Sequence, residues 1–220
     1  MPQRYNLIAK EGWNPIFSFV LLAFLLHYYF GFSIAAPTEF AVLLLLFLFR
    51  DPSRKIPPLP LGIVAPVDGV VVAIGPVIDP YLEADTLRIE FKGHAWGVFT
   101  VRSPMEGKVN KQWFNVVANN AKTQVPIAAI AGHFAQWTQS DEGDNVIMAL
   151  TPRFYKRTPQ CAVSSGERIG QGQRCGFIPF GANAVVYVPA NSRVDVNVGD
   201  EVMAGSSIIA TLVRAHLPGN

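Results

Sequence analysis

Few residues of this 220-residue chain have types and spacings suited to catalysis. The chain has four histidines and two cysteines, and no histidine lies at a spacing that would complete a zinc site with the cysteines. We therefore predict no metal site, and we expect Cys161 and Cys175 to be reduced thiols in a core. The pairs Ser164–Ser165 and Ser206–Ser207 adjoin glycines, as is typical of turns and strand starts. Neither pair predicts a nucleophile.

Two charged residues have more particular neighbours. Asp68 precedes Gly69 and opens an apolar run, which ordinary turn chemistry explains. Arg102 ends another apolar run. Its guanidinium could hold a phosphate through two hydrogen bonds, or it could pair with a surface acid. The sequence leaves both alternatives open for Arg102.

The composition limits the partners of the chain. Half of the residues are hydrophobic and 15% are charged, with a net charge of +2 and no long run of Lys or Arg. A nucleic-acid partner would need a strongly basic surface, so we expect none. Hydrophobic residues are concentrated near the N-terminus, which points instead to a phospholipid membrane as a partner.

Residues 1–50 are predicted to form a membrane hairpin of two short apolar helices. The clean apolar runs are Ile16–Leu26 and Phe40–Phe49, and each covers only about 15–17 Å as a helix, against about 30 Å of hydrocarbon. Either the helices extend into their flanks and span the bilayer, or they form a re-entrant hairpin in one leaflet, which we favour. A buried hairpin in a soluble protein is disfavoured, because the second run is apolar all round.

Basic residues flank the two outer ends of this hairpin, whereas the connection between the runs carries a single charge, Glu39. The basic residues are Arg4, Lys10, Arg50, Arg54 and Lys55. Because positive flanks remain on the cytoplasmic side of a membrane, we expect an inner-membrane protein with the rest of the chain in the cytoplasm.

The remainder of the chain is predicted to be mainly β. Residues 51–61 contain four prolines and form a linker. Residues 62–220 contain short Val- and Ile-rich runs separated by turn residues, which predicts a compact antiparallel sandwich or barrel-like domain. We expect strands that include residues 97–101 and 194–198, and we allow one helix within residues 124–139. A carrier domain is disfavoured, because neither hairpin tip offers a suitably placed lysine.

Four ordered motifs resemble the phosphatidylserine decarboxylase family, in its short bacterial and archaeal form. The first two are Phe47–Pro57, read as FLFRDPSRKIP, and Ala65–Gly69, read as APVDG. The third and fourth are Val98–Gly107, read as VFTVRSPMEG, and Gly172–Ala182, read as GQRCGFIPFGA. A strand ending at Pro189 follows the last motif. The resemblance covers nearly the whole chain and implies the family's β fold.

The resemblance also implies a specific chemistry. Family members decarboxylate the serine headgroup of a phospholipid with a pyruvoyl group made from their own chain. The serine of a Gly-Ser turn attacks the preceding carbonyl, β-elimination splits the chain, and the new N-terminus becomes the pyruvoyl group. An Asp and a His of the family act as orienter and base for that serine, in the manner of a catalytic triad.

This sequence departs from the family at two of those three positions. Asp68 is retained, but Phe99 stands in place of the histidine and Ala182 in place of the serine. We therefore predict no self-cleavage and no pyruvoyl cofactor, and no catalytic residue is assigned. His94 is not expected to replace the imidazole, since an odd offset in a strand would put it on the opposite face from Phe99.

The predicted function is therefore that of a membrane-anchored, catalytically silent relative. It would act as a lipid-binding or accessory subunit in a complex with other membrane proteins. The candidate lipid-headgroup residues are Asp68, Arg102, Gly181 and Asn183. The alternative is an active phosphatidylserine decarboxylase that makes phosphatidylethanolamine. His133 and the segment Ser140–Asn145 lie where the resemblance is poorest.

Overall fold

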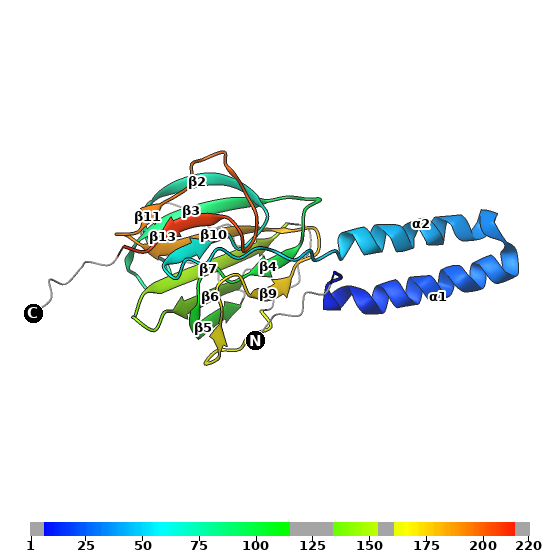
Figure 1. Cartoon of the computed structure of the whole chain (residues 1–220), viewed down its shortest axis with the longest axis horizontal. Helices are drawn as coiled ribbons and strands as arrows, with labels where there is room; N and C mark the ends of the chain where they lie inside the picture. The colour runs from blue at the N-terminus through cyan, green and yellow to red at the C-terminus, as the bar shows by residue number, and fades with distance from the viewer. Residues whose placement is uncertain (1–6, 115–133, 154–160, 214–220) are drawn as a thin grey trace, which may run out of the picture. The chain divides into compact units, whose positions relative to one another are not determined.

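The computed structural model describes residues 7–114, 134–153 and 161–213 (Figure 1). The chain divides into two compact units, Met1–Ser53 and Arg54–Asn220, with the division falling inside the predicted linker 51–61. The first unit is called the helical hairpin below, and the second the β domain.

The helical hairpin consists of two antiparallel helices, α1 and α2, preceded by a short 3-10 turn. The turn η1 spans Lys10–Gly12, α1 spans Trp13–Phe30 and α2 spans Phe32–Leu48, with Gly31 as the connection. Both helices extend well beyond the clean apolar runs. At about 1.5 Å per residue they are about 27 and about 26 Å long. The stretch Lys10–Phe30 is long and apolar enough to cross a membrane, as judged by length and composition.

The apolar side chains of the hairpin mostly point away from the helix pair. Phe17, Phe24 and Phe40 are each about two-thirds exposed, whereas the small residues Ala23 and Ala35 are buried between the helices. Close contact through alanines with large apolar groups outside is the arrangement expected of helices that meet lipid rather than water.

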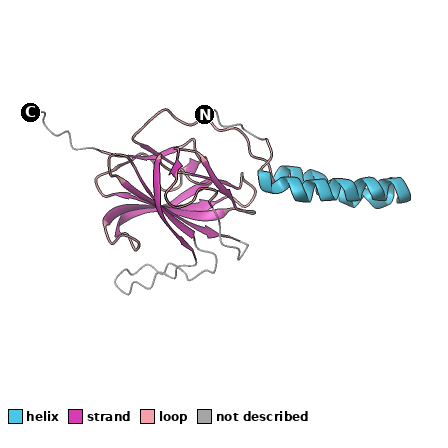
Figure 2. Ribbon diagram, turned by 90° about the horizontal axis from the view of Figure 1, so that it is seen from below, coloured by secondary structure: helices cyan, strands magenta, loops and turns pink. Residues whose placement is uncertain are grey.

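The β domain is antiparallel throughout its described strand pairs, which confirms the predicted mainly β fold. Its largest sheet has eight strands in the order β12-β2-β3-β10-β7-β6-β5-β8, and Figure 2 shows this sheet strongly curled. Their bounds are Glu201–Val202, Gly69–Ile78, Asp85–Gly93, Ala182–Pro189, Asn145–Pro152, Phe134–Gln139, Gly107–Phe114 and Arg168–Ile169.

Two smaller sheets complete the domain. One has the order β1-β13-β11, with bounds Gly62–Val64, Ile208–Thr211 and Arg193–Val194, and the other pairs β4, Thr100–Arg102, with β9, Arg174–Phe177. Alternation along β10 shows how the core forms. Val186 and Val188 join the main core, whereas Tyr187 belongs to a second apolar cluster. The large sheet therefore buries apolar side chains on both faces.

Of the predicted strand 97–101, only Thr100 and Val101 lie in β4. One further strand prediction and the allowed helix are also wrong. Of residues 194–198, only Val194 lies in a strand, because Asp200 draws the chain into a turn by accepting a hydrogen bond from the Asn197 backbone N–H at 2.7 Å. The helix allowed in residues 124–139 is excluded for 134–139, which form β6. Residues 124–133 lie outside the described part of the chain.

The expectation of reduced core thiols is also wrong in this structure. Cys161 and Cys175, which are 14 positions apart in the sequence, form a disulfide with 4.6 Å between their Cα atoms. The chain before β9 folds back on it, and the Ala162 backbone N–H donates to the Cys175 carbonyl. Spacing along the chain could not reveal this contact, because it depends on how the intervening residues return.

Candidate functional site

The fourth motif ends in a turn that leads into β10, and two residues of this turn have positive φ angles. Phe180 has φ +63° and Gly181 has φ +80°, and the Gly181 N–H donates to the Ile178 carbonyl at 3.0 Å. A Cβ at residue 181 would lie 2.7 Å from the His94 carbonyl oxygen, so only glycine fits there. Phe180 adopts the same left-handed region with a side chain, which is unfavourable for a bulky residue. The turn is therefore held in one particular conformation.

Ala182 begins β10 and is buried between two neighbouring strands. It pairs with Pro152 of β7, and its methyl group lies in the main core with 1% of the residue exposed. On the β3 side, a Cβ at Gly93 would come within 2.1 Å of the Ala182 carbonyl oxygen. The carbonyl that precedes Ala182, that of Gly181, accepts a hydrogen bond from the Arg153 N–H at 3.2 Å.

Phe99 lies beside this turn in an aromatic cluster. Its ring contacts those of Phe177 and Phe180, each with centroids 6.2 Å away, and 3% of the residue is exposed. Its backbone carbonyl accepts the Ile178 N–H at 2.9 Å, which fixes it against the chain that leads into the turn. A phenyl ring can neither accept nor donate a proton, so this position contributes packing.

Asp68 lies at the same end of the sheet, with both carboxylate oxygens occupied. Oδ2 accepts a hydrogen bond from Arg54 Nη2 at 2.6 Å, and Oδ1 accepts the Ala204 backbone N–H at 2.7 Å. Its backbone carbonyl accepts the His94 N–H at 3.0 Å. The carboxylate is mostly buried, which strengthens both contacts. In this arrangement Asp68 orients Arg54 and the Ala204 loop.

Sequence reasoning used Arg54 as a flanking charge and missed it as the partner of Asp68. The sequence does contain an indication that both residues matter, since Arg54 belongs to the FLFRDPSRKIP motif and Asp68 to the APVDG motif. Their meeting across 14 residues required the fold. The segment that contains Arg54 also packs against Gly172 through Ile56, because a Cβ added at Gly172 would lie 2.9 Å from Ile56 Cγ1.

The four candidate headgroup residues differ in setting. Arg102 is 3% exposed, and its Nη1 donates to the Gly172 carbonyl at 3.1 Å. The Gly181 N–H is used within its own turn. Asn183 is exposed on β10 opposite Thr151. The structure thus brings Asp68 and Gly181 to one end of the sheet, buries the Arg102 side chain and leaves Asn183 at the surface.

The reasoning that placed His94 opposite Phe99 on one strand is wrong. β3 ends at Gly93, and residues 94–99 bend before β4 begins at Thr100. His94 is half-buried, and its backbone touches both Asp68 and the turn at Gly181. His133 lies outside the described residues. Across the described ranges, no cluster of three or more His, Cys, Asp or Glu side chains is placed to hold a metal.

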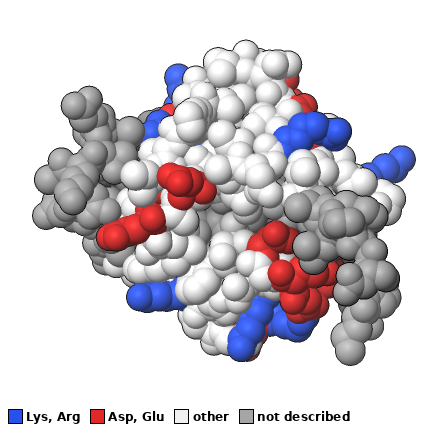
Figure 3. Space-filling model, turned by 90° about the vertical axis from the view of Figure 1, so that its left-hand side faces the viewer, with Lys and Arg blue, Asp and Glu red and all other residues white. Residues whose placement is uncertain are grey.

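The opposite end of the same sheet has a polar cavity of about 520 Å³. It lies at the β2–β3 and β6–β7 turns and at the end of β10. Its lining includes Asp79, Asp85, Trp137, Asp144, Asn145 and Tyr187. Acidic side chains also gather in two groups on the face of the molecule shown in Figure 3. No residue of the four quoted motifs lines this cavity, although Pro189, which ends the strand after the fourth motif, does.

Asp79 is the buried anchor of that end. It is fully buried, and its carboxylate accepts the backbone N–H groups of Tyr81 at 3.0 Å and Leu82 at 2.9 Å. Burial raises its pKa above the ordinary value, and the two backbone hydrogen bonds oppose that shift. Burial likewise raises the pKa of the Tyr187 hydroxyl.

Comparison with known proteins relates this arrangement to one family. Residues 100–210 match the family model described as phosphatidylserine decarboxylase. A Nitrosomonas eutropha protein is 34% identical over 207 residues, which cover 94% of this chain and 95% of that protein. An Aromatoleum aromaticum protein is 36% identical over 212 residues, covering 94% and 97%. Both relatives are named phosphatidylserine decarboxylase proenzyme.

Proposed function

The chain belongs to the phosphatidylserine decarboxylase family, and we propose that it is a catalytically silent, membrane-anchored member of it. In this proposal the chain keeps the family's β domain but makes no pyruvoyl group. It acts instead as a lipid-binding or accessory subunit of a membrane complex. The family assignment rests on the comparisons, and the silence and the accessory role are our inference.

The observation that carries the proposal is the alanine at residue 182. Self-cleavage of the family type needs an oxygen on that residue, first as the nucleophile and then as the leaving group of the elimination. The methyl group of Ala182 offers neither, and it is packed in the core at the start of β10. Residue 182 therefore does not fit the pyruvoyl group that the family implies, and we derive no step through that group.

The surroundings of Ala182 support the same proposal. Phe99 fills the expected position of the base with a buried ring, and each oxygen of the Asp68 carboxylate already accepts one hydrogen bond, from Arg54 and from the Ala204 N–H. Two independent replacements, on different segments, favour long-standing loss of the reaction over a single inactivating change. The close backbone contacts at Gly93 and Gly181 show that this end of the β domain is tightly packed, which supports a continuing role for the fold.

An active phosphatidylserine decarboxylase is the alternative function. The names of the relatives favour it, since proteins 33–36% identical over 94% of this chain carry the name phosphatidylserine decarboxylase proenzyme. Under this alternative, the chain would produce phosphatidylethanolamine and would need a carbonyl cofactor formed at another residue.

We further propose that the helical hairpin anchors the protein in the inner membrane, with the β domain in the cytoplasm. The outward-facing apolar side chains support insertion, and the basic flanks support cytoplasmic outer ends. Helices of about 26 and 27 Å favour the spanning alternative over the re-entrant one. The disulfide is typical of an oxidising compartment and is the feature that favours the opposite side. A reporter active only in the cytoplasm, fused to the C-terminus, distinguishes the two orientations.

The proposal is tested by an activity assay with a matched control. The full-length chain and its Aromatoleum aromaticum relative are purified in the same detergent and given vesicles that contain phosphatidylserine. We expect phosphatidylethanolamine to form only with the relative, and only the relative to react with a carbonyl reagent. Turnover by both proteins would establish the alternative function.

A further inference from the structure

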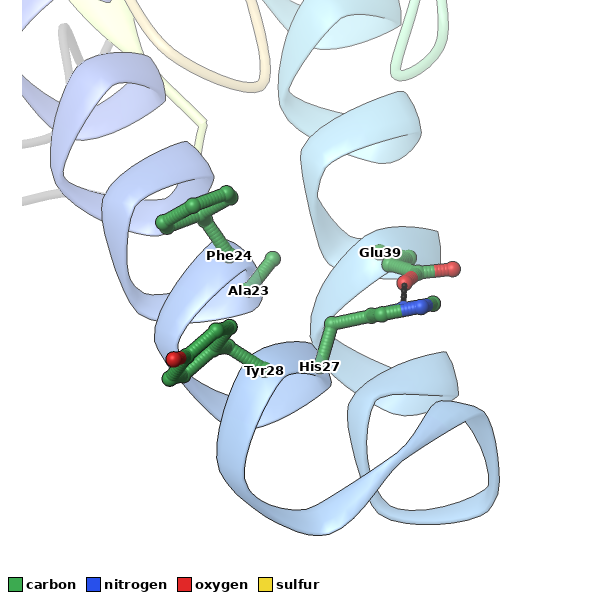
Figure 4. Close-up of a pocket in the computed structure, with 5 residues that line it drawn as sticks. All are labelled: Ala23, Phe24, His27, Tyr28 and Glu39. Atoms are coloured by element: carbon green, nitrogen blue, oxygen red, sulfur yellow. Dashed lines mark hydrogen bonds and ion pairs between the residues drawn. The ribbon is translucent and has the colours of Figure 1, made fainter.

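The two long helices of the helical hairpin carry one acidic residue, Glu39, and one histidine, His27, and the two are paired. His27 Nδ1 of α1 lies 2.8 Å from Glu39 Oε1 of α2, as Figure 4 shows. The rest of α1 and α2 has no Asp, Glu, Lys or Arg. The pair is not hidden between the helices, because 55% of the His27 side chain and 37% of the Glu39 side chain remain exposed.

A cavity of about 320 Å³ adjoins the pair. Ala23, Phe24, His27, Tyr28 and Glu39 line it, so that one polar pair is surrounded by apolar and aromatic groups. Ala23 leaves room beside the pair, while Phe24 and Tyr28 project outward with about two-thirds or more of their surface exposed. The hairpin therefore presents an almost wholly apolar hollow next to one partly exposed polar pair.

The net charge of the His27–Glu39 pair determines which of its atoms can still donate or accept a hydrogen bond. In hydrocarbon, a pair with no net charge is strongly favoured over one with a net charge. When one proton is shared between Nδ1 of His27 and Oε1 of Glu39, a net-neutral pair arises in two ways, with that proton on the imidazole or on the carboxyl group. In both cases, the second ring nitrogen of His27, Nε2, carries an N–H donor, and Oε2 of Glu39 remains an acceptor.

One unused donor and one unused acceptor on the same surface make that surface self-complementary. In lipid no water satisfies these atoms, so a polar partner must. A second copy related by a twofold axis satisfies both at once, since the Nε2–H of each copy can donate to the Glu39 oxygen of the other. A partner with only a donor or only an acceptor would satisfy half of the atoms.

We propose that the His27–Glu39 pocket is a docking surface for a second copy of this chain, so that two hairpins associate in the bilayer through reciprocal hydrogen bonds. The proposal rests on the membrane insertion proposed above. In this proposal the role of the His27–Glu39 pair is to hold two copies of the chain together, and the β domain does not take part in the contact.

The test uses the full-length chain in phosphatidylcholine vesicles. Two batches are labelled at the N-terminal amine with a donor or an acceptor dye, and energy transfer is followed as the lipid-to-protein ratio rises. Flotation of the vesicles first establishes insertion for every variant, and circular dichroism establishes helix content. The variants are Glu39→Gln, Glu39→Leu and His27→Leu, with Ser18→Ala as the matched control on α1, away from the pocket.

We expect the unmodified chain to dimerise. Glu39→Gln should associate within about threefold of it, because glutamine keeps an acceptor and can donate to His27. Glu39→Leu and His27→Leu should each raise the dissociation constant by on the order of 10- to 100-fold, as expected for loss of two interhelical hydrogen bonds. Ser18→Ala should leave it unchanged.

Three results would overturn the proposal. Inserted but monomeric wild-type chain would show that the pocket does not receive a second copy, while leaving the membrane anchor intact. Equal association by all variants would place the contact elsewhere. Failure of the wild-type chain to float with vesicles would overturn both this proposal and the proposed anchor.

Discussion

The eight-stranded sheet has two ends, and they differ in the side chains that close them. At one end, β2 and β10 begin at Gly69 and Ala182 and β3 finishes at Gly93, and close backbone contacts and the Phe99 ring fill the space between them. At the other end, where β10 finishes at Pro189, acidic and aromatic residues surround a cavity of about 520 Å³. The first of these is called the closed end and the second the polar end, and Asp68, Phe99 and Ala182 from the family motifs lie at the closed end.

This difference separates two properties that are often found together in enzymes. A polar cavity with a pKa-shifted acid is the usual indication of a reactive site, yet here it lies at the end opposite the family's reaction turn. We propose that the closed end keeps the fold of the family and lacks the side chains of its reaction. Substitutions can test the two ends of the sheet separately.

The largest effect is expected at the closed end, when the two missing groups are restored. Ala182→Ser alone should stay uncleaved, because Phe99 supplies no base, whereas Phe99→His combined with Ala182→Ser is the variant in which we expect self-cleavage. The fraction cleaved is measured by intact mass after prolonged incubation. Phe99→His alone is the control, since it lacks a nucleophile. Robust cleavage of Ala182→Ser alone would contradict our account of residue 99.

The next effect concerns the Arg54–Asp68 pair at the same end. Asp68→Ala should lower the free energy of unfolding by about 2–4 kcal/mol, because it leaves a mostly buried guanidinium and the Ala204 N–H without an acceptor. Urea unfolding of the full chain in detergent, followed by tryptophan fluorescence, measures the loss. The double variant Arg54→Ala/Asp68→Ala should be less destabilised than the sum of the two single variants. Additive losses would mean that the pair contributes no coupling.

At the polar end, Asp79 predicts a pH dependence of stability. Its folded pKa is raised by burial, so the folded state holds a proton that the unfolded state has already released. The free energy of unfolding should therefore fall as the pH rises from the ordinary value of 3.8 towards the raised pKa, with a slope of at most about 1.4 kcal/mol per pH unit. Asp79→Asn should remove this component. An unchanged pH profile in that variant would show that Asp79 does not titrate as its burial implies.

The smallest effect is expected for a second Asp–Arg pair, also at the polar end. Asp141 accepts two hydrogen bonds from Arg168 at 2.7 and 2.6 Å, but both side chains are more than half exposed. Asp141→Ala should not shift the urea midpoint measurably, since solvent and salt screen such pairs. This variant is the exposed counterpart of Asp68→Ala. A loss as large as that of Asp68→Ala would mean that burial does not explain the difference between them.

The mainly β fold and three residues of the candidate site could be predicted from the sequence. Alternating Val and Ile runs specify strands locally, and the order of the motifs assigns Asp68, Phe99 and Ala182 to one family site. The Arg54–Asp68 contact and the Cys161–Cys175 disulfide were missed, because both depend on the path of the chain between distant residues. The polar cavity was missed for a similar reason, since β2–β3 and β6–β7 turns meet only after the sheet has formed.

The central claim is that the peptide bond between Gly181 and Ala182 stays intact, and the mass of the purified full-length chain tests it most directly. Our account predicts one polypeptide of about 24.1 kDa that is unreactive towards carbonyl reagents, even after prolonged incubation with phosphatidylserine vesicles. Recovery of a 181-residue fragment and a 39-residue fragment, with a carbonyl group at residue 182, would contradict it.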